Sequence, residues 1–403
     1  MLARPTQAVC PPPLSLRLVT DRAGLDDLAA AWEELRASSN TPEPMLSANW
    51  LRTWWRIYGE GTGRRLCVGL FLDGDRLLGL APLQARRVWH HRVLPLRRLE
   101  FLGADVDEND GVCSEYLNLL ARTGHEEQVA RAFATAVAQG RFGPWDELVL
   151  SRMDGSGAAP VQLAESFARH GLTSVVTTTS GAPFLRLPPT WDDYIANLPS
   201  RKRRFLLKSL SQFDDWAGDD ARFLEVHDAT DLETGRRILA DLHQQRWHGT
   251  DQPGAFSSPR FEAFHQQHMR DLLDDGKLEL FWLEVRGQPI AAHYNFIAND
   301  KTYYYQSGRR MDLPTGVNPG TIIMVRALKN AMARGAREFD FLADPSQFKA
   351  QFTTTIRPLV QLRVTHGSFL SRAAARRHRA NARPLARARQ FVRRLAHSPR
   401  LTP

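Results

Sequence analysis

The sequence predicts a mixed α/β protein with two tandem domains, each a mixed central sheet flanked by helices. Strand-like and helix-like patterns alternate along the whole chain, which favours this class over a helical bundle or a β-sandwich. The 403 residues suit two cores of ordinary size better than one. The hairpin patterns at 67–83 and 281–296 also resemble each other, since each has an apolar strand, a charged turn with glycine, and a second strand that begins with small residues.

In the first half, Asp73-Gly74-Asp75 is a hairpin turn signal, and Ser47 is a suitable N-cap for a helix rich in tryptophan. We expect strands at 14–19, at 65–88 (two strands joined at 73–75), and at 97–105, 146–153 and 173–187. We expect helices at 25–39, 47–59, 126–140 and near 158–170.

In the second half, residues 277–308 predict three consecutive strands with turns at 286–288 and 299–300. The other expected strands are 221–228, 337–344 and 359–364, with a short helix between the last two. The expected helices are 190–198, 201–216, 230–247, 258–276 and 320–335.

Composition excludes several classes of protein. Hydrophobic residues make up 43% and charged residues 24%, the balance of a globular chain. No apolar run approaches the roughly 20 residues that a transmembrane helix needs, and the N-terminus lacks the apolar stretch of a secretory signal. Three scattered cysteines predict neither a disulfide framework nor a metal site. We therefore expect a cytoplasmic protein with reduced thiols and no metal.

The net charge of +9 comes from one end of the chain. Residues 371–403 hold ten arginines and no acidic residue, which leaves −1 for the rest. Such a tail is suited to an anionic membrane surface or to nucleic acid, and a solvated end explains it equally well. The predicted organisation is a flexible leader at 1–13, a first domain at 14–187, a second domain at 188–368 and a basic tail at 369–403.

The pattern with most chemical content is a strand at 303–307, a polar loop at 308–319 and an apolar helix from Gly320. The start of a helix presents free N–H groups and a positive dipole end, which together bind anions such as phosphates. Gly308 and Gly316 would let the loop backbone approach such a ligand closely, and Asn318 is placed to cap the helix. An ordinary strand–loop–helix connection has the same pattern.

The runs 242–256, 278–296, 303–344 and 348–349 resemble the CelD-like acetyltransferase family of the GNAT superfamily. That family is similar to the FemAB aminoacyltransferases, which contain two GNAT domains. The resemblance is strongest over 190–352 and fainter in the first half. It implies that both predicted domains are GNAT-like, with acetyl-CoA or another acyl-CoA bound by the second and the first lining the acceptor cleft. The loop at 308–319 is longer than the usual GNAT loop, which leaves the acyl carrier open.

The resemblance implies that the strand at 303–307 receives the acyl thioester and that the following loop and helix hold the CoA pyrophosphate. The residues assigned to this donor site are Gln306, Ser307, Gly308, Arg309, Gly316, Asn318, Pro319, Gly320 and Thr321.

Acyl transfer also needs a proton acceptor and a donor for the developing oxyanion. The candidate catalytic residues are His293, Tyr305, Asp340 and Lys349, the last in a Phe-Lys pair that is similar to one in Fem-like proteins. Core packing is an equally ordinary role for the histidine and the tyrosine. Residues assigned to the acceptor are Arg246, Trp247 and Tyr303.

The leading hypothesis is transfer of an acyl group from acyl-CoA to an amine or hydroxyl of a sugar, a cell-envelope or exopolysaccharide precursor, or a small metabolite. One alternative is Fem-like aminoacyl transfer from tRNA to a peptide. The other is a non-catalytic binding protein that uses its basic tail.

Overall fold

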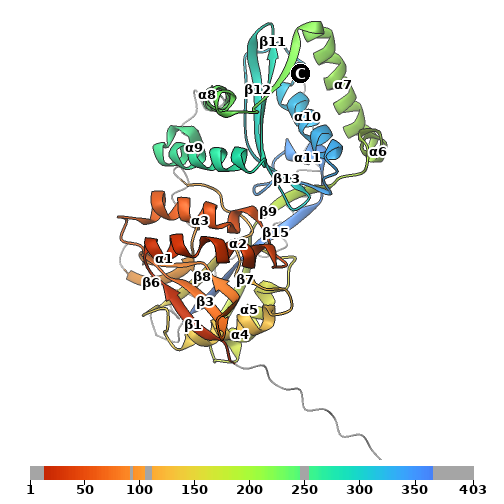
Figure 1. Cartoon of the computed structure of the whole chain (residues 1–403). Helices are drawn as coiled ribbons and strands as arrows, with labels where there is room; N and C mark the ends of the chain where they lie inside the picture. The colour runs from red at the N-terminus through yellow and green to blue at the C-terminus, as the bar shows by residue number, and fades with distance from the viewer. Residues whose placement is uncertain (1–12, 91–93, 105–110, 246–253, 366–403) are drawn as a thin grey trace, which may run out of the picture.

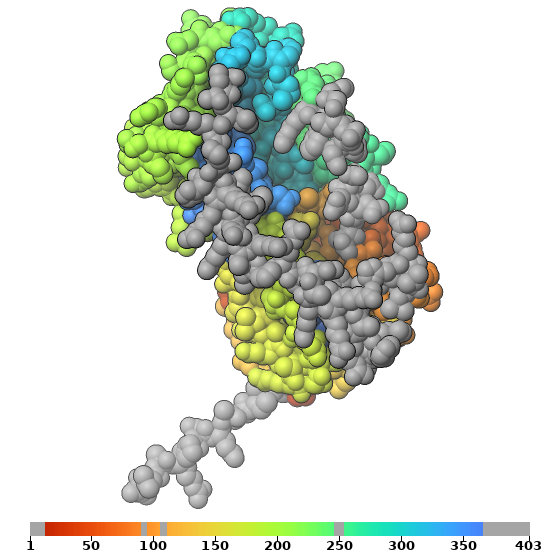
Figure 2. Space-filling model, turned by 180° about the vertical axis from the view of Figure 1, so that it is seen from behind, coloured from red at the N-terminus to blue at the C-terminus, as the bar shows by residue number. Residues whose placement is uncertain are grey.

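The computed structural model describes residues 13–90, 94–104, 111–245 and 254–365. The predicted tail at 369–403 and all of the predicted leader except residue 13 lie outside these ranges. Within them, no helix has the length and apolar character needed to cross a bilayer. The two halves of the chain form two lobes (Figure 1). Seen from behind, the C-terminal part of the second half reaches the surface where the lobes meet (Figure 2).

Strands and helices alternate in both halves, as the patterns predict. The first half contains β1 (Ser15–Val19), α1 (Arg22–Asp27), α2 (Ala29–Ala37), η1 (Pro44–Leu46), α3 (Ala48–Trp54), η2 (Trp55–Gly59), β2 (Arg65–Leu66), β3 (Val68–Asp73), β4 (Arg76–Ala81), β5 (Leu83–His90), β6 (Leu94–Phe101), β7 (Leu120–Ala121), α4 (Glu126–Ala138), β8 (Glu147–Asp154), α5 (Ala159–Ala168) and β9 (Thr173–Arg186). The second half contains α6 (Trp191–Asn197), α7 (Ser200–Ala217), η3 (Gly218–Asp220), β10 (Ala221–Glu225), α8 (Ala229–Gln245), η4 (Ala255–Ser257), α9 (Pro259–Asp274), β11 (Leu278–Val285), β12 (Gln288–Ala298), β13 (Lys301–Arg309), α10 (Pro319–Ala333), β14 (Glu338–Asp340), α11 (Lys349–Phe352) and β15 (Ile356–Thr365).

The described strands form a large sheet that crosses both lobes and a small sheet in the first lobe. The large sheet has the order β10-β11-β12-β13-β14-β9-β15-β8-β6-β5-β2, and the small one β1-β3-β4-β7. Most neighbours are antiparallel, whereas β13 with β14 and β6 with β8 are parallel. The predicted class, mixed α/β with mixed sheets flanked by helices, is therefore confirmed.

The two halves repeat one arrangement. Each half contains two antiparallel strands, then a helix, and then a strand that runs parallel to the second of the two. These elements are β5, β6, α4 and β8 in the first half and β12, β13, α10 and β14 in the second. Each parallel contact spans three residue pairs, at 98–100 with 147–149 and at 301–303 with 338–340. This repeat agrees with the similarity between the two predicted hairpins.

The halves exchange their last strands. β9, the last strand of the first half, pairs with β14 of the second half. β15, the last strand of the second half, pairs with β8 of the first half and also with β9. The predicted boundary at 187/188 falls just after β9, and the domain limits stay a prediction, but β15 contributes to the sheet of the first lobe.

The three-stranded pattern at 277–308 folds as expected. Its turns use positive φ at Arg286 (53°), Asn299 (53°) and Asp300 (58°), which asparagine and aspartate tolerate better than most residues. The expectation of two strands at 65–88 is wrong, because each of them breaks and changes sheets. Cys67 separates β2 from β3, and Pro82 separates β4 from β5, so only β3 and β4 form the predicted hairpin.

The lobes share a hydrophobic core. Trp50 on α3 is fully buried and packs edge-on against Phe264 on α9, with ring centroids 4.7 Å apart. A second core lies between the large sheet and helices α6, α7 and α10, around Phe339 and Phe341. The shared core and the exchanged strands fix the loops of the first lobe against the second half of the sheet.

Candidate active site

A cavity of about 640 Å³ lies where β13, the start of α10 and the segment after β14 meet a loop of the first lobe. Its lining includes polar groups from both halves of the chain, among them Glu115 and Lys349. The lining residues are Cys113, Glu115, Phe205, His293, Tyr304, Tyr305, Gln306, Ser307, Gly308, Arg309, Asn318, Gly320, Thr321, Ile323, Phe341, Leu342, Ala343, Asp344, Ser346, Gln347, Phe348, Lys349 and Gln351.

One wall of the cavity is a strand edge that no neighbouring strand covers in the described part of the chain. β14 pairs with β13 only as far as Tyr303, whereas β13 continues to Arg309. Tyr305 lies between two registered pairs and forms a bulge. Beyond the bulge, Arg310 donates its N–H to Ile290, so by antiparallel alternation Ser307 turns its own N–H away from β12, towards the uncovered edge.

The start of α10 forms the end of this wall. Asn318 occupies the N-cap position, but its side chain donates to the Gly316 carbonyl (3.1 Å) rather than capping the first turn. Arg309 packs closely on the helix start, since a Cβ at Gly320 would lie 3.2 Å from its Cδ. A guanidinium stem beside the positive end of a helix makes this place suited to an anion.

Gly308 has a packing role in the fold. A Cβ at this position would lie 2.4 Å from the backbone nitrogen of His243 on α8. The glycine therefore lets α8 pack against β13, and this explains the residue without any ligand.

Glu115 is the acidic group most clearly suited to proton transfer. Its side chain is 2% exposed and its Oε1 lies 3.3 Å from Arg152, while Oε2 has no hydrogen-bond partner among the described residues. Burial raises the pKa of this carboxyl to about 7, although the charges of Arg152 and Lys349 lower it. A carboxylate with a pKa near neutrality is the usual property of a general base.

Unusual backbone conformations gather around the same carboxylate. Tyr116, the next residue, has a φ of 60°, and Arg152, its ion-pair partner, has a φ of 59°. Across the cavity, Leu342 (56°) and Asp344 (67°) have the same left-handed conformation. Non-glycine residues adopt it at a cost, and such positions concentrate at functional sites. The other described non-glycine residues with positive φ belong to the hairpin turns at 286 and 299–300.

Asp340 lies behind the cavity and joins its two walls. One carboxylate oxygen accepts from the Tyr116 hydroxyl (2.7 Å) and from Arg357 (2.8 Å), and the other accepts from the Leu342 N–H (2.8 Å). The side chain is fully buried, and burial raises the pKa of this carboxyl to about 6 against the opposing charge of Arg357. These bonds make Asp340 a positioning residue for the walls that carry Glu115 and Leu342.

The other predicted catalytic residues line the cavity. His293 is 1% exposed, and burial lowers the pKa of its imidazole to about 3, so the ring is neutral. Tyr305 accepts from the Cys113 N–H at 3.1 Å, and burial raises the pKa of its phenol well above the usual value. Lys349 donates to the Leu342 and Ala343 carbonyls, and burial lowers the pKa of its amine.

The structure thus brings most predicted site residues together. Ten of them line the cavity: His293, Tyr305, Gln306, Ser307, Gly308, Arg309, Asn318, Gly320, Thr321 and Lys349. Asp340, Tyr303, Gly316 and Pro319 are not part of its lining. Tyr303 instead donates its hydroxyl to Glu43 of the first lobe at 2.6 Å. Arg246 and Trp247, assigned to the acceptor, lie outside the described residues.

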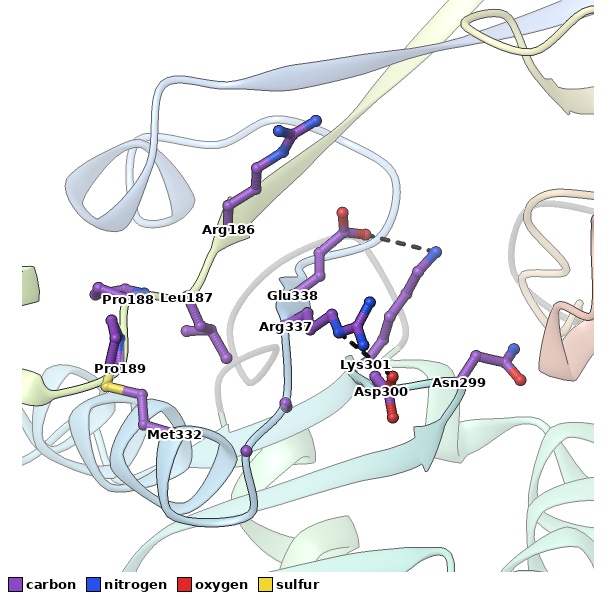
Figure 3. Close-up of a pocket in the computed structure, with 12 residues that line it drawn as sticks. Arg186, Leu187, Pro188, Pro189, Asn299, Asp300, Lys301, Met332, Arg337 and Glu338 are labelled. Carbon is purple, nitrogen blue, oxygen red and sulfur yellow. Dashed lines mark ion pairs between the residues drawn. The ribbon is translucent and has the colours of Figure 1, made fainter.

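A second cavity, of about 770 Å³, lies at the opposite ends of β13 and α10 (Figure 3). Four of its charged groups pair with one another, Lys301 with Glu338 and Arg337 with Asp300, each at 3.6 Å. The figure shows these side chains extending from the β12–β13 turn and from the start of β14. Both carboxylates of its lining, Asp300 and Glu338, are held in ion pairs, so this lining has no group comparable to Glu115, and we assign the cavity no role.

Sequence reasoning missed Glu115 and its partner Arg152. Glu115 lies in a loop outside any periodic pattern, and its partner is 37 residues further along the chain. The available signal was a Ser-Glu-Tyr run before the leucine-rich residues 117–120, and it does not distinguish a surface loop from a catalytic one.

Comparisons with known proteins agree with this geometry. Residues 200–350 match the family model described as an acetyltransferase (GNAT) domain. The crystal structure of FemX is similar in fold, with a TM-score of 0.56 and 11% identity over 83% of this chain and 95% of that one. A conserved protein of unknown function from Bacteroides thetaiotaomicron has a TM-score of 0.52 and 9% identity over 88% and 100%. A search of curated protein sequences found no match.

At these identities the structural likeness concerns the fold alone. The matched segment runs from α7 into α11 and contains β13, the start of α10 and the segment after β14, all of which line the cavity. Residues 200–350 are therefore similar to the acetyltransferase (GNAT) domain family, over less than half of the chain.

Proposed function

We propose that this protein transfers an acyl group from acyl-CoA, with acetyl-CoA as the first candidate, to an amine or hydroxyl of a polar acceptor. The observation that carries the proposal is the uncovered edge of β13 beyond Tyr303, which follows the cavity between the start of α10 and Glu115. The thioester arm would lie along this edge, with the diphosphate at the start of α10 beside Arg309. The CelD-like resemblance of 190–352 agrees with such a donor.

In the proposed reaction the acceptor nitrogen or oxygen attacks the thioester carbonyl while Glu115 takes its proton. The backbone N–H of Ser307 would donate to the oxyanion, and the C–S bond then breaks. Tyr305, whose raised phenol pKa keeps it protonated, would protonate the leaving CoA thiolate. Lys349 would offset the negative charge that develops nearby. Acceptors of the expected class are sugars, envelope or exopolysaccharide precursors, and small metabolites.

The first test is calorimetric titration of the full chain with CoA and acetyl-CoA. Binding of both is expected, and it should weaken when Gly320 is replaced by aspartate, which adds a negative charge at the helix start. Thr234→Asp, at a half-buried position of α8, provides a control with the same charge change away from the cavity. Absence of CoA binding by the unaltered chain would reject the proposal.

Turnover is then measured as release of free thiol from acetyl-CoA in the presence of candidate acceptors. The Fem-like alternative instead predicts consumption of aminoacyl-tRNA without thiol release. A non-catalytic protein would give neither, and its partner binding would depend on residues 371–403. The role of this tail and a cytoplasmic location stay predictions.

A further inference from the structure

We infer that one face of α7 binds the 3′-phosphate and adenine of the CoA donor, an inference that rests on the proposed function. Arg201, Arg204, Phe205 and Lys208 are spaced three and four residues apart, so they share one face of this 18-residue helix. All four side chains are exposed. We call them the α7 stripe.

The α7 stripe adjoins the donor end of the cavity. Phe205 itself lines the cavity together with Gly320 and Thr321 at the start of α10. Gln212, one turn beyond Lys208 on the same face, has its amide 3.0 Å from where a Cβ of Gly316 would lie. The stripe therefore runs beside the loop that leads into α10.

The charges on the stripe have no ion-pair partner among the described residues. In the described ranges, Arg201, Arg204 and Lys208 form no ion pair with a carboxylate, whereas most cations of the first lobe's sheet do. The opposite face of the helix is apolar and buried through Leu206 and Phe213. A stripe of three unpaired cations around an exposed aromatic ring matches a phosphate next to a base, because the guanidinium groups pair with phosphate and the ring stacks on the base.

The chemistry of CoA places these groups at the right end of the molecule. Its diphosphate, assigned to the start of α10, is one ribose away from the 3′-phosphate and the adenine. A donor with its diphosphate beside Gly320 would extend this end towards Phe205, whereas the thioester would point along β13 towards Glu115. The stripe thus distinguishes CoA from carriers that lack the 3′-phosphate.

The test compares CoA with 3′-dephospho-CoA, which differ in this phosphate alone, by calorimetry on the full chain. The unaltered protein should bind CoA about tenfold more tightly, since an exposed cation contributes roughly two- to threefold and there are three. The R201Q/R204Q/K208Q variant should bind both ligands with the affinity that the unaltered protein has for dephospho-CoA. Phe205→Ala should weaken both ligands equally, because both contain adenine.

The matched control is K202Q/R203Q, which removes two charges from the same helix but off the stripe and should keep the discrimination. Equal affinity of the unaltered protein for both ligands overturns the inference while leaving the proposed function intact. If neither ligand binds, the proposed function itself fails. A third outcome is that the unaltered protein binds tRNA but does not distinguish CoA from 3′-dephospho-CoA, and that the triple variant loses the tRNA binding. The stripe then binds a polynucleotide, and the inference is wrong.

Discussion

Glu115→Gln gives the sharpest test of the proposed chemistry. The carboxyl has a pKa of about 7 and must be ionised to accept a proton. About a tenth of it is ionised at pH 6, so kcat/KM should fall about tenfold between its plateau and pH 6. Glutamine keeps the shape but accepts no proton, and we expect kcat/KM to fall about 10²- to 10⁴-fold with loss of this pH-dependent limb.

Two further substitutions should move the limb in opposite directions. The positive charge of Arg152 lowers the pKa of Glu115, so Arg152→Gln should shift the limb to higher pH. The negative charge of Asp344 raises it, so Asp344→Asn should shift the limb to lower pH. Asparagine also tolerates the φ of 67° at that position. Thiol release from acetyl-CoA, recorded from pH 5.5 to 9, measures these shifts.

The Glu115 carboxyl also makes the stability of the fold depend on pH. Its folded pKa of about 7 exceeds the ordinary 4.5, so its contribution to stability is present at low pH and is lost as pH rises from 4.5 through 7. By pH 8 the cost is about 3 kcal/mol, and Glu115→Gln should remove it before the lost contact with Arg152 is counted. Our account of this residue would be refuted if kcat/KM of Glu115→Gln still fell at acid pH and the variant were no more stable than the unaltered protein at pH 8.

Gly308→Ala should lower the free energy of unfolding in urea by about 2 kcal/mol or more, because the new Cβ would overlap the backbone of α8. Gly157→Ala is the control and should change it little, since the nearest atom to a Cβ there is 3.6 Å away. Burial lowers the pKa of His268 to about 3, so the folded protein is less able than the unfolded chain to bind a proton there. The free energy of unfolding should therefore decrease as pH falls below 6.5, by about 1 kcal/mol at pH 5.5. His268→Phe should flatten that part of a stability–pH curve. Asp340→Asn removes one of three carboxylates around Arg357, which keeps Glu338 and Asp154, and should destabilise the fold by about 2 kcal/mol through the lost charge-assisted hydrogen bond. An unchanged midpoint in thermal or urea unfolding would argue against the positioning role.

The parts of the fold that sequence reasoning predicted are those set by local patterns. The strands at 278–309 are largely apolar runs joined by turns that favour positive φ, so both strands and turns were predicted. The apolar run at 65–88 carries no comparable signal where it changes sheets, at Cys67 and Pro82. Pairing of β9 with β14 and of β15 with β8 depends on contacts between distant segments, which no local pattern encodes.

The candidate site divides in the same way. Residues 304–309 and 318–321 form one strand–loop–helix motif, so their proximity followed from the sequence. Glu115 reaches the cavity only because the first lobe packs against the second, and no sequence pattern pairs it with Arg152. Asp340 was found as a candidate, but the bonds from Tyr116 and Arg357 that make it a link between two walls come from other elements.

The exchange of terminal strands bears on how the protein is made. During synthesis the nascent first lobe would leave the ribosome with β8 lacking the neighbour that β15 supplies some 200 residues later. Until then β8 presents an open backbone edge to other chains, a situation that favours chaperone contact and aggregation. Neither half is then an independent unit, and separating them after residue 187 would leave each with an incomplete sheet.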